Sequence, residues 1–228
     1  MEDIHCWQTK FVPCVYSVRL LAKLSGLNRN ALNKVDITEV KKAIYYAKKY
    51  HGDQKRQSGE PYYSHPLEVA HMVSDYLFRT DIIVTSILHD TIEDTELTFS
   101  MIQKIFGKNV ATQVMDLTRI KEDGKKISSA ALIESLLSAK KYDMLLIKQF
   151  DRLHNLQTIE AKSAEKIQKI IEETAKQFIG LSVFLETIDV EKVLIKICLK
   201  YLNVTHWPQN QQEFSYLQEN SPLFFPVQ

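Results

Sequence analysis

Apolar side chains recur at helical spacing along almost the whole of this 228-residue chain. They fall three and four residues apart, the spacing that gives a helix one apolar face. Only six glycines and six prolines occur, and most of them lie between the periodic segments. No stretch alternates apolar and polar residues for long enough to indicate a strand. The sequence therefore predicts an all-α fold, a helical bundle of about eight to ten helices.

Capping residues and turn residues place these helices along the chain. Asp36 is predicted to cap a helix over 37–51, with Glu39 three residues later in the position that completes a capping box. The other predicted start residues are Asp81, Thr98, Ser163 and Asp189, and the predicted stops include Gly26 and Gly107. The predicted helices cover residues 16–25, 37–51, 66–77, 82–94, 99–106, 110–119, 129–140, 142–157, 164–187 and 190–202.

The charge balance limits the partners that we expect. Lys and Arg total 29 against 28 Asp and Glu, a formal net charge of +1. This balance argues against a nucleic-acid coat protein, although a local basic cluster is enough to bind a small anion. No apolar run reaches the roughly 18 residues of a membrane span, and the N-terminus has no signal-peptide core. We therefore expect neither a nucleic-acid nor a membrane partner, and an oligomer stays an open alternative.

The cysteines indicate a reducing compartment. Cys6, Cys14 and Cys198 are odd in number and contain no C-x-x-C pair. A disulfide framework or a zinc knuckle is therefore not expected. Together with the lack of a secretory signal, this predicts a cytoplasmic protein.

Ionisable residues are concentrated in the string ILHDTIEDT. His89 and Glu93 are four residues apart, as are Asp90 and Asp94, so on a helix these four groups share one side. The other side of the same segment is strongly apolar, and burying such a cluster without partners would be very costly. A divalent cation would neutralise the carboxylates and accept imidazole nitrogen. The mixed nitrogen and oxygen set suits manganese, iron, zinc or magnesium better than copper or calcium.

Two further strings strengthen this interpretation, because an adjacent His and Asp alone is a weak signal. One is RQSGEPYYSHP, which runs from Arg56 to Pro66 and places His65 just before a predicted helix. The other is FDRLHNLQT, from 150 to 158, which places Asp151 inside one. His154 also lies in this second string.

The three strings together resemble the hydrolase domain of the RelA/SpoT family, in order and in spacing. The family pattern is R-x-S-G-E-P-Y-x-x-H-P, then H-D-x-x-E-D-T, then D-R-L-H-N, and the phrase FGKNVA near Phe106 matches as well. The resemblance covers about residues 36–202. It implies an HD-domain helical bundle over 36–202, an N-terminal helical extension over 1–35, and an irregular tail over 203–228, where eight Asn or Gln residues and three prolines occur.

The resemblance implies an activity and a metal. The family degrades guanosine tetra- and pentaphosphate (ppGpp and pppGpp), which would end the stringent-response signal. Water would attack the 3′-pyrophosphate, giving GDP or GTP plus pyrophosphate, in a reaction that depends on one manganese ion. The implied metal ligands are His65, His89, Asp90 and Asp151. A bound ion lowers the pKa of its water, and a nearby carboxylate can accept the proton.

The resemblance also implies roles for the remaining site residues. Glu93 and Asp94 would orient or deprotonate the attacking water. The substrate partner would be a guanine nucleotide, bound by Arg56 and Ser58 at the base and by Asn155 and Thr158 at the ribose and phosphates. A basic run that includes Lys48, Lys49 and Lys55 would attract this polyanion.

The chain departs from the family pattern at three points. Gln149 and Phe150 replace a small or aliphatic pair before Asp151, so the packing there must adapt. Gln57 replaces a basic residue, which removes one positive charge near the nucleotide. Residues 203–228 contain no synthetase motif, so we expect a hydrolase-only protein.

Two other functions stay open at this point. One is a phosphohydrolase of the same type that acts on another nucleotide phosphate, such as the 2′-phosphate of NADPH. The other is a non-catalytic protein that binds the guanine nucleotide. The presence of both Glu93 and Asp94 argues against a pure binder, because such a protein has little need for a second carboxylate pair.

Overall fold

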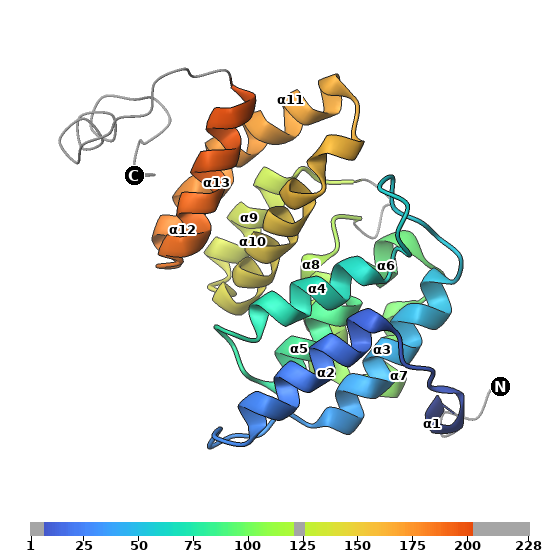
Figure 1. Cartoon of the computed structure of the whole chain (residues 1–228). Helices are drawn as coiled ribbons and strands as arrows, with labels where there is room; N and C mark the ends of the chain where they lie inside the picture. The colour runs from blue at the N-terminus through green and yellow to red at the C-terminus, as the bar shows by residue number, and fades with distance from the viewer. Residues whose placement is uncertain (1–6, 121–125, 203–228) are drawn as a thin grey trace. The chain divides into compact units, whose positions relative to one another are not determined.

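The computed structural model describes residues 7–120 and 126–202 of the chain (Figure 1). Within these ranges the chain is helical, and the only β-type pairings are isolated bridges such as Lys55 with Pro61. The all-α prediction is confirmed. The described residues divide into two compact units, with the boundary between His154 and Asn155. The predicted boundaries at 35 and 202 stay predictions, and the predicted irregular tail over 203–228 lies outside the described residues.

The helices of the first unit run in the following order. They are α1 (Trp7–Lys10), α2 (Val15–Asn28), α3 (Ile37–His51), α4 (Ser64–Val73), α5 (Thr80–Leu88), α6 (Thr91–Asp94), α7 (Phe99–Phe106), α8 (Lys108–Leu117), α9 (Ser129–Ser138) and α10 (Tyr142–Gln157), whose last turn enters the second unit. The second unit continues with a short 3-10 helix (Ile159–Ala161), α11 (Ala164–Glu173), a π-helical turn (Thr174–Phe178), α12 (Ile179–Phe184) and α13 (Ile188–Tyr201).

Helix α5 is the centre of the first unit. It packs against α3, α4 and α8, and every side chain from Ile82 to Leu88 is buried. A helix that is apolar all round can be stable only in such a position, because it has no face to offer to water. Side chains of α2, α3, α4, α7 and α8 complete the same core. The C-terminal end of α5 is therefore fixed firmly inside the unit, and His89 follows it directly.

The start of α3 confirms the Asp36 cap and corrects one detail. The Asp36 carboxylate accepts hydrogen bonds from the backbone N–H groups of Thr38 and Glu39 at 2.8 and 3.2 Å. The predicted capping box does not form, because the Asp36 N–H donates to the Thr80 hydroxyl at 2.9 Å. The Glu39 carboxylate instead pairs with Lys42 at 2.6 Å. The cap thereby joins the starts of α3 and α5.

Two predicted helices are interrupted. The segment 82–94 was predicted as one helix, but α5 ends at Leu88 and α6 begins at Thr91, with His89 and Asp90 in the turn between them. The segment 164–187 contains the π-helical turn and ends at Phe184. Periodicity did not indicate either interruption, because apolar residues continue at helical spacing through both.

Several predicted ends differ from the structure by a few residues. Helix α2 continues through Gly26 to Asn28, and α4 begins at Ser64 and ends at Val73. Of the other predicted caps, Thr98 forms one, since its hydroxyl accepts from the backbone N–H of Met101. Asp81 and Asp189 lie in the first turns of their helices rather than at the caps. Ser163 makes no side-chain cap hydrogen bond. Gly107 ends α7 as predicted, with a φ of 89° that favours glycine.

Within the described residues, no helix has both the length and the apolar character needed to span a bilayer.

The Asp36 cap gives a stability prediction. Asp36→Ala should lower the free energy of unfolding by about 1 kcal/mol, because two N–H groups at the start of α3 lose their acceptor. Asp53→Ala, in the exposed turn after α3, is the matched control and should change it little. Urea unfolding followed by circular dichroism measures both. Equal stability of the two variants would show that the cap contributes nothing.

Candidate metal centre

Four side chains from three separate segments meet in the first unit. His65 comes from the first turn of α4, His89 and Asp90 from the turn after α5, and Asp151 from the middle of α10. The Nε2 atom of His65 lies 3.1 Å from Asp151 Oδ1 and 3.5 Å from Asp90 Oδ2. The Nε2 atom of His89 lies 3.0 Å from Asp90 Oδ1 and 3.9 Å from Asp151 Oδ1. The structure therefore brings together all four residues predicted to bind a metal.

Burial makes the charges of this cluster costly unless other charges compensate them. His65, His89 and Asp151 are each less than a tenth exposed, and their candidate ligand atoms all lie within 4.8 Å of one another. Imidazole nitrogens and carboxylate oxygens at this separation are the donor set of a divalent transition-metal site. Such groups are seldom buried together unless a cation or protons compensate them.

The hydrogen bonds of His89 leave one nitrogen available for an ion. Its Nδ1 lies 2.8 Å from the carbonyl oxygen of Ser86. Because a carbonyl only accepts, Nδ1 donates to it, and Nε2 is the nitrogen that faces the cluster. This Nε2 is buried and makes no hydrogen bond within the described part of the chain. A buried imidazole nitrogen that faces two carboxylates needs a positive charge, either a second proton of its own or a bound cation, so the residues fit a metal ligand set.

His65 is supported by a second imidazole. Its Nδ1 lies 2.9 Å from the Nδ1 of His154, so one of the two nitrogens donates to the other. Burial, with the nearby His65 and Arg56, lowers the pKa of His154 to about 3. His154 is therefore neutral. In this structure the Nε2 of His65 donates to the Asp151 carboxylate, so its Nδ1 accepts from His154. An ion bound at Nε2 would reverse this pairing, with His154 accepting the Nδ1 proton of His65. This supports the prediction that His154 acts outside the ligand set.

The ionisation of the cluster follows from its two carboxylates. Burial lowers the pKa of His65, and it also acts to lower that of His89. At His89, however, the charges of Asp90 and Asp151 outweigh the effect of burial and raise the pKa of this imidazole to about 10. Although burial opposes it, His89 holds the pKa of Asp90 below its usual range. The cluster thus retains a proton on His89 that a metal ion would displace on binding.

Lys148 is a member of this site that the sequence analysis did not identify. Its ammonium lies 2.5 Å from Asp151 Oδ2, one helical turn away on α10. Burial acts to raise the pKa of Asp151, but Lys148 and the histidines hold it well below its usual range. The signal was present in the sequence, because residues three apart on a helix are neighbours.

Asp94, one of the two predicted catalytic carboxylates, is held beside the cluster by Tyr62. The Tyr62 hydroxyl donates to Asp94 Oδ2 at 2.6 Å and lies 3.5 Å from Asp90 Oδ2. Burial, followed by Asp90 and Asp94, raises the pKa of Tyr62 far above its usual value, so this hydroxyl remains a donor. The Tyr62 ring stacks on the buried His51 at a centroid distance of 4.7 Å.

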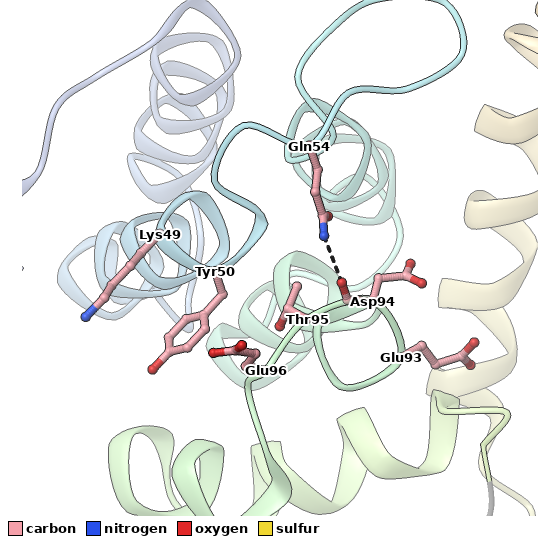
Figure 2. Close-up of a pocket in the computed structure, with 7 residues that line it drawn as sticks. All are labelled: Lys49, Tyr50, Gln54, Glu93, Asp94, Thr95 and Glu96. Atoms are coloured by element: carbon pink, nitrogen blue, oxygen red, sulfur yellow. Dashed lines mark hydrogen bonds between the residues drawn. The ribbon is translucent and has the colours of Figure 1, made fainter. Parts of the chain in front are cut away.

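Gln54 also holds Asp94 in position beside the cluster. Its side-chain N–H donates to the main-chain carbonyl of Asp94 at 3.0 Å (Figure 2). Its side-chain oxygen lies 2.9 Å from His51 Nδ1. His51, Gln54, Tyr62 and Asp94 therefore form a closed ring of contacts between the end of α3 and α6.

Glu93, the other predicted catalytic carboxylate, has cationic neighbours. Its Oε1 accepts a hydrogen bond from the backbone N–H of Arg119, and its Oε2 lies 3.0 Å from the Lys126 ammonium. Because the chain turns at His89 and Asp90, the expectation that Glu93 lies on one continuous helical face with His89 is wrong. Glu93 instead connects α6 to the residues that follow α8.

A cavity of about 550 Å³ opens beside these carboxylates. Figure 2 shows Lys49 and Tyr50 on the α3 side, and Glu93 and Asp94 extending their carboxylates away from them. The lining residues are Lys49, Tyr50, Gln54, Glu93, Asp94, Thr95 and Glu96. The two acidic residues are thus accessible to a small molecule.

The predicted nucleotide-binding residues lie in two places. Arg56 is in the loop between α3 and α4; its side chain is mostly buried and lies 3.8 Å from Glu60, while Ser58 in the same loop is exposed. Asn155 lies in the last turn of α10 and Thr158 directly follows that helix, both half-buried and both in the second unit. Their roles in binding stay predictions.

Comparisons with known proteins support the predicted resemblance. The HD domain family matches residues 43–182. The GTP pyrophosphokinase rsh of Brucella ovis is 38% identical over 181 residues, which cover 76% of this chain and 24% of that protein. The guanosine-3′,5′-bis(diphosphate) 3′-pyrophosphohydrolase of Aquifex aeolicus is 36% identical over 166 residues, 72% of this chain and 24% of that protein. The chain thus spans about a quarter of the length of these curated relatives.

A solved structure shares the fold. It belongs to a metazoan ortholog of SpoT described as hydrolyzing ppGpp, and it has a TM-score of 0.61 at 22% sequence identity. The likeness covers 72% of this chain and 96% of that one. This likeness confirms the fold, while the family match and the relatives from Brucella ovis and Aquifex aeolicus confirm the resemblance that the three sequence strings predicted.

The cluster gives a prediction about metal removal. Mn²⁺ at 100 times its dissociation constant should stabilise the protein by about 2.7 kcal/mol, because the ion binds only the folded chain, and a chelator should reverse the effect. Thermal unfolding monitored by circular dichroism measures the shift. His89→Ala should abolish it, whereas His71→Ala, outside the cluster on α4, should retain it. A full Mn²⁺ shift in the His89 variant would contradict the assignment.

Proposed function

Because the chain belongs to the HD-domain family, we propose that it hydrolyses the 3′-pyrophosphate of guanosine tetra- and pentaphosphate. The products are GDP or GTP and pyrophosphate. The observation that carries this proposal is the meeting of His65, His89, Asp90 and Asp151 from three distant segments around one buried point. The name of the relative from Aquifex aeolicus supports the choice of substrate.

We propose that His65, His89, Asp90 and Asp151 hold a single Mn²⁺ ion. Two imidazoles and two carboxylates suit an ion that accepts both nitrogen and oxygen, and manganese is such an ion. When bound, a divalent ion polarises phosphate oxygens and lowers the pKa of water. The remaining steps belong to the side chains of the chain itself.

Asp94 is the proposed proton acceptor. Its Oδ2 is held by the Tyr62 hydroxyl beside Asp90, at the rim of the cavity. As the attacking water forms its bond to the phosphorus atom next to the ribose, Asp94 takes the water's proton. The bond between that phosphorus and the ribose 3′ oxygen breaks, the 3′ oxygen takes up a proton from solvent, and Asp94 then releases to solvent the proton that it accepted. Glu93, fixed by Arg119 and Lys126, orients the water.

The substrate side is proposed from the loop after α3 and from the end of α10. Arg56 and Ser58 contact the guanine base, and Asn155 and Thr158 contact the ribose and phosphates. Gln57 supplies no positive charge, so substrate affinity is where this chain should differ from relatives with a basic residue there. Phe150 is accommodated without displacing Asp151, since its ring is buried against Tyr76 at a centroid distance of 5.1 Å.

The direct test is an activity assay. Purified protein with Mn²⁺ and guanosine tetraphosphate should release GDP and pyrophosphate, separated by ion-exchange chromatography, and a chelator should stop the release. Release of phosphate from NADPH but not from guanosine tetraphosphate would favour the other phosphohydrolase. Binding of guanosine tetraphosphate without turnover in the presence of Mn²⁺ would favour a non-catalytic binder.

The acidic pair gives a prediction about turnover. Asp94→Asn should lower kcat by about 100-fold or more, because the amide cannot accept the proton. Binding of Mn²⁺ should be unchanged, since Asp94 is outside the ligand set. Glu134→Gln, an exposed change on α9, is the control for loss of one carboxylate. Loss of metal content in the Asp94 variant, measured by elemental analysis, would mean that Asp94 is a ligand instead.

A further inference from the structure

The two oxygens of the Asp151 carboxylate have different neighbours. Oδ1 faces the cluster, 3.1 Å from the Nε2 of His65. Oδ2 faces the other way, 2.5 Å from the ammonium of Lys148. A carboxylate used in this way offers an ion one oxygen rather than two. The geometry therefore fixes how Asp151 binds as well as where it lies.

The Lys148–Asp151 pair is unlike an ordinary surface ion pair. Both side chains are only 11% exposed. Lys42 and Glu39 have the same spacing on α3, but the Glu39 side chain is 37% exposed. Exposed pairs are screened by water and contribute little, whereas the charge of a mostly buried ammonium is felt strongly by its neighbours. Lys148 must therefore act on whatever Asp151 binds.

We infer that Lys148 is a positioning residue that restricts Asp151 to one metal-facing oxygen and weakens that oxygen as a ligand. This inference rests on the proposed metal site, but not on the identity of the substrate. The ammonium draws electron density toward Oδ2 and repels a divalent ion at Oδ1. Lys148 thus lowers the affinity of the site for the ion while it holds the Asp151 side chain in position.

Charge counting shows what this arrangement does for the proposed reaction. Two neutral imidazoles and two carboxylates carry a charge of −2, which a divalent ion cancels. Lys148 then makes the assembly positive by one unit. A positive centre attracts a highly anionic nucleotide, and an ion that is less neutralised by its ligands polarises phosphate oxygens more strongly. The arrangement therefore lowers the affinity of the site for the ion and makes the bound ion a stronger Lewis acid.

The experiment measures Mn²⁺ affinity directly. Wild type and three variants are titrated with Mn²⁺, and the free ion is quantified by electron paramagnetic resonance. Lys148→Met should bind Mn²⁺ about tenfold more tightly, within the range by which outer residues change metal affinity. Lys148→Arg keeps the charge and should stay close to wild type. Lys42→Met removes a lysine with the same spacing on α3 and should have no effect.

The outcomes separate positioning from mere support of the fold. A residue that only stabilised the local structure would, when removed, weaken Mn²⁺ binding. Weaker or unchanged Mn²⁺ affinity in Lys148→Met therefore overturns the inference. Lys148→Gln serves as a second uncharged variant, and it should also bind more tightly if the Met variant does not fold.

Turnover of guanosine tetraphosphate forms a separate arm. Lys148→Met should lower kcat although it binds the ion more tightly, and Lys148→Arg should restore much of it. If wild type hydrolyses no guanosine tetraphosphate while the Mn²⁺ affinities change as expected, the proposed function fails and the inference on Lys148 stands.

Discussion

The structure depends on charge placed at the end of a buried helix. Helix α5 offers no side chain from Ile82 to Leu88 to solvent, so its position is set by the core around it. The chain then turns at His89 and Asp90 and meets His65 and Asp151. Burying two carboxylates would be very costly without compensation. Lys148 supplies part of this compensation, and the rest comes from a proton on His89 or from the proposed ion that would displace it.

A second layer of contacts holds the ligand set in shape. Ser86 fixes the ring of His89, His154 faces His65, and Lys148 holds the outer oxygen of Asp151. The Tyr62 hydroxyl joins this layer to Asp94, so the ligands and the proposed base belong to one connected network. A site built in this way needs little rearrangement to bind an ion, which is the condition for efficient electrostatic catalysis.

The sequence predicted the parts of the structure that local rules control. The bounds of α3 and α10 match the predicted 37–51 and 142–157, because strong periodicity and a clear cap or turn define their ends. The four proposed ligands were predicted from the resemblance, and the structure brings their side chains together. The break at His89 was missed because periodicity does not report the local polar contacts found there: His89 Nδ1 faces the carbonyl oxygen of Ser86, and the Thr91 hydroxyl donates to that of Leu88. Lys148 was missed because a lysine on a helix usually indicates a solvated face.

The long sequence separation between the proposed ligands affects how readily the protein would be degraded. His65 and Asp151 are 86 residues apart, so an ion held between them would act as a cross-link that closes a long loop. Its release would leave the folded state without that cross-link, and local opening would become more frequent. Proteases act on opened states. A cell short of the ion would thus hold less of this protein, so that metal supply would set its abundance.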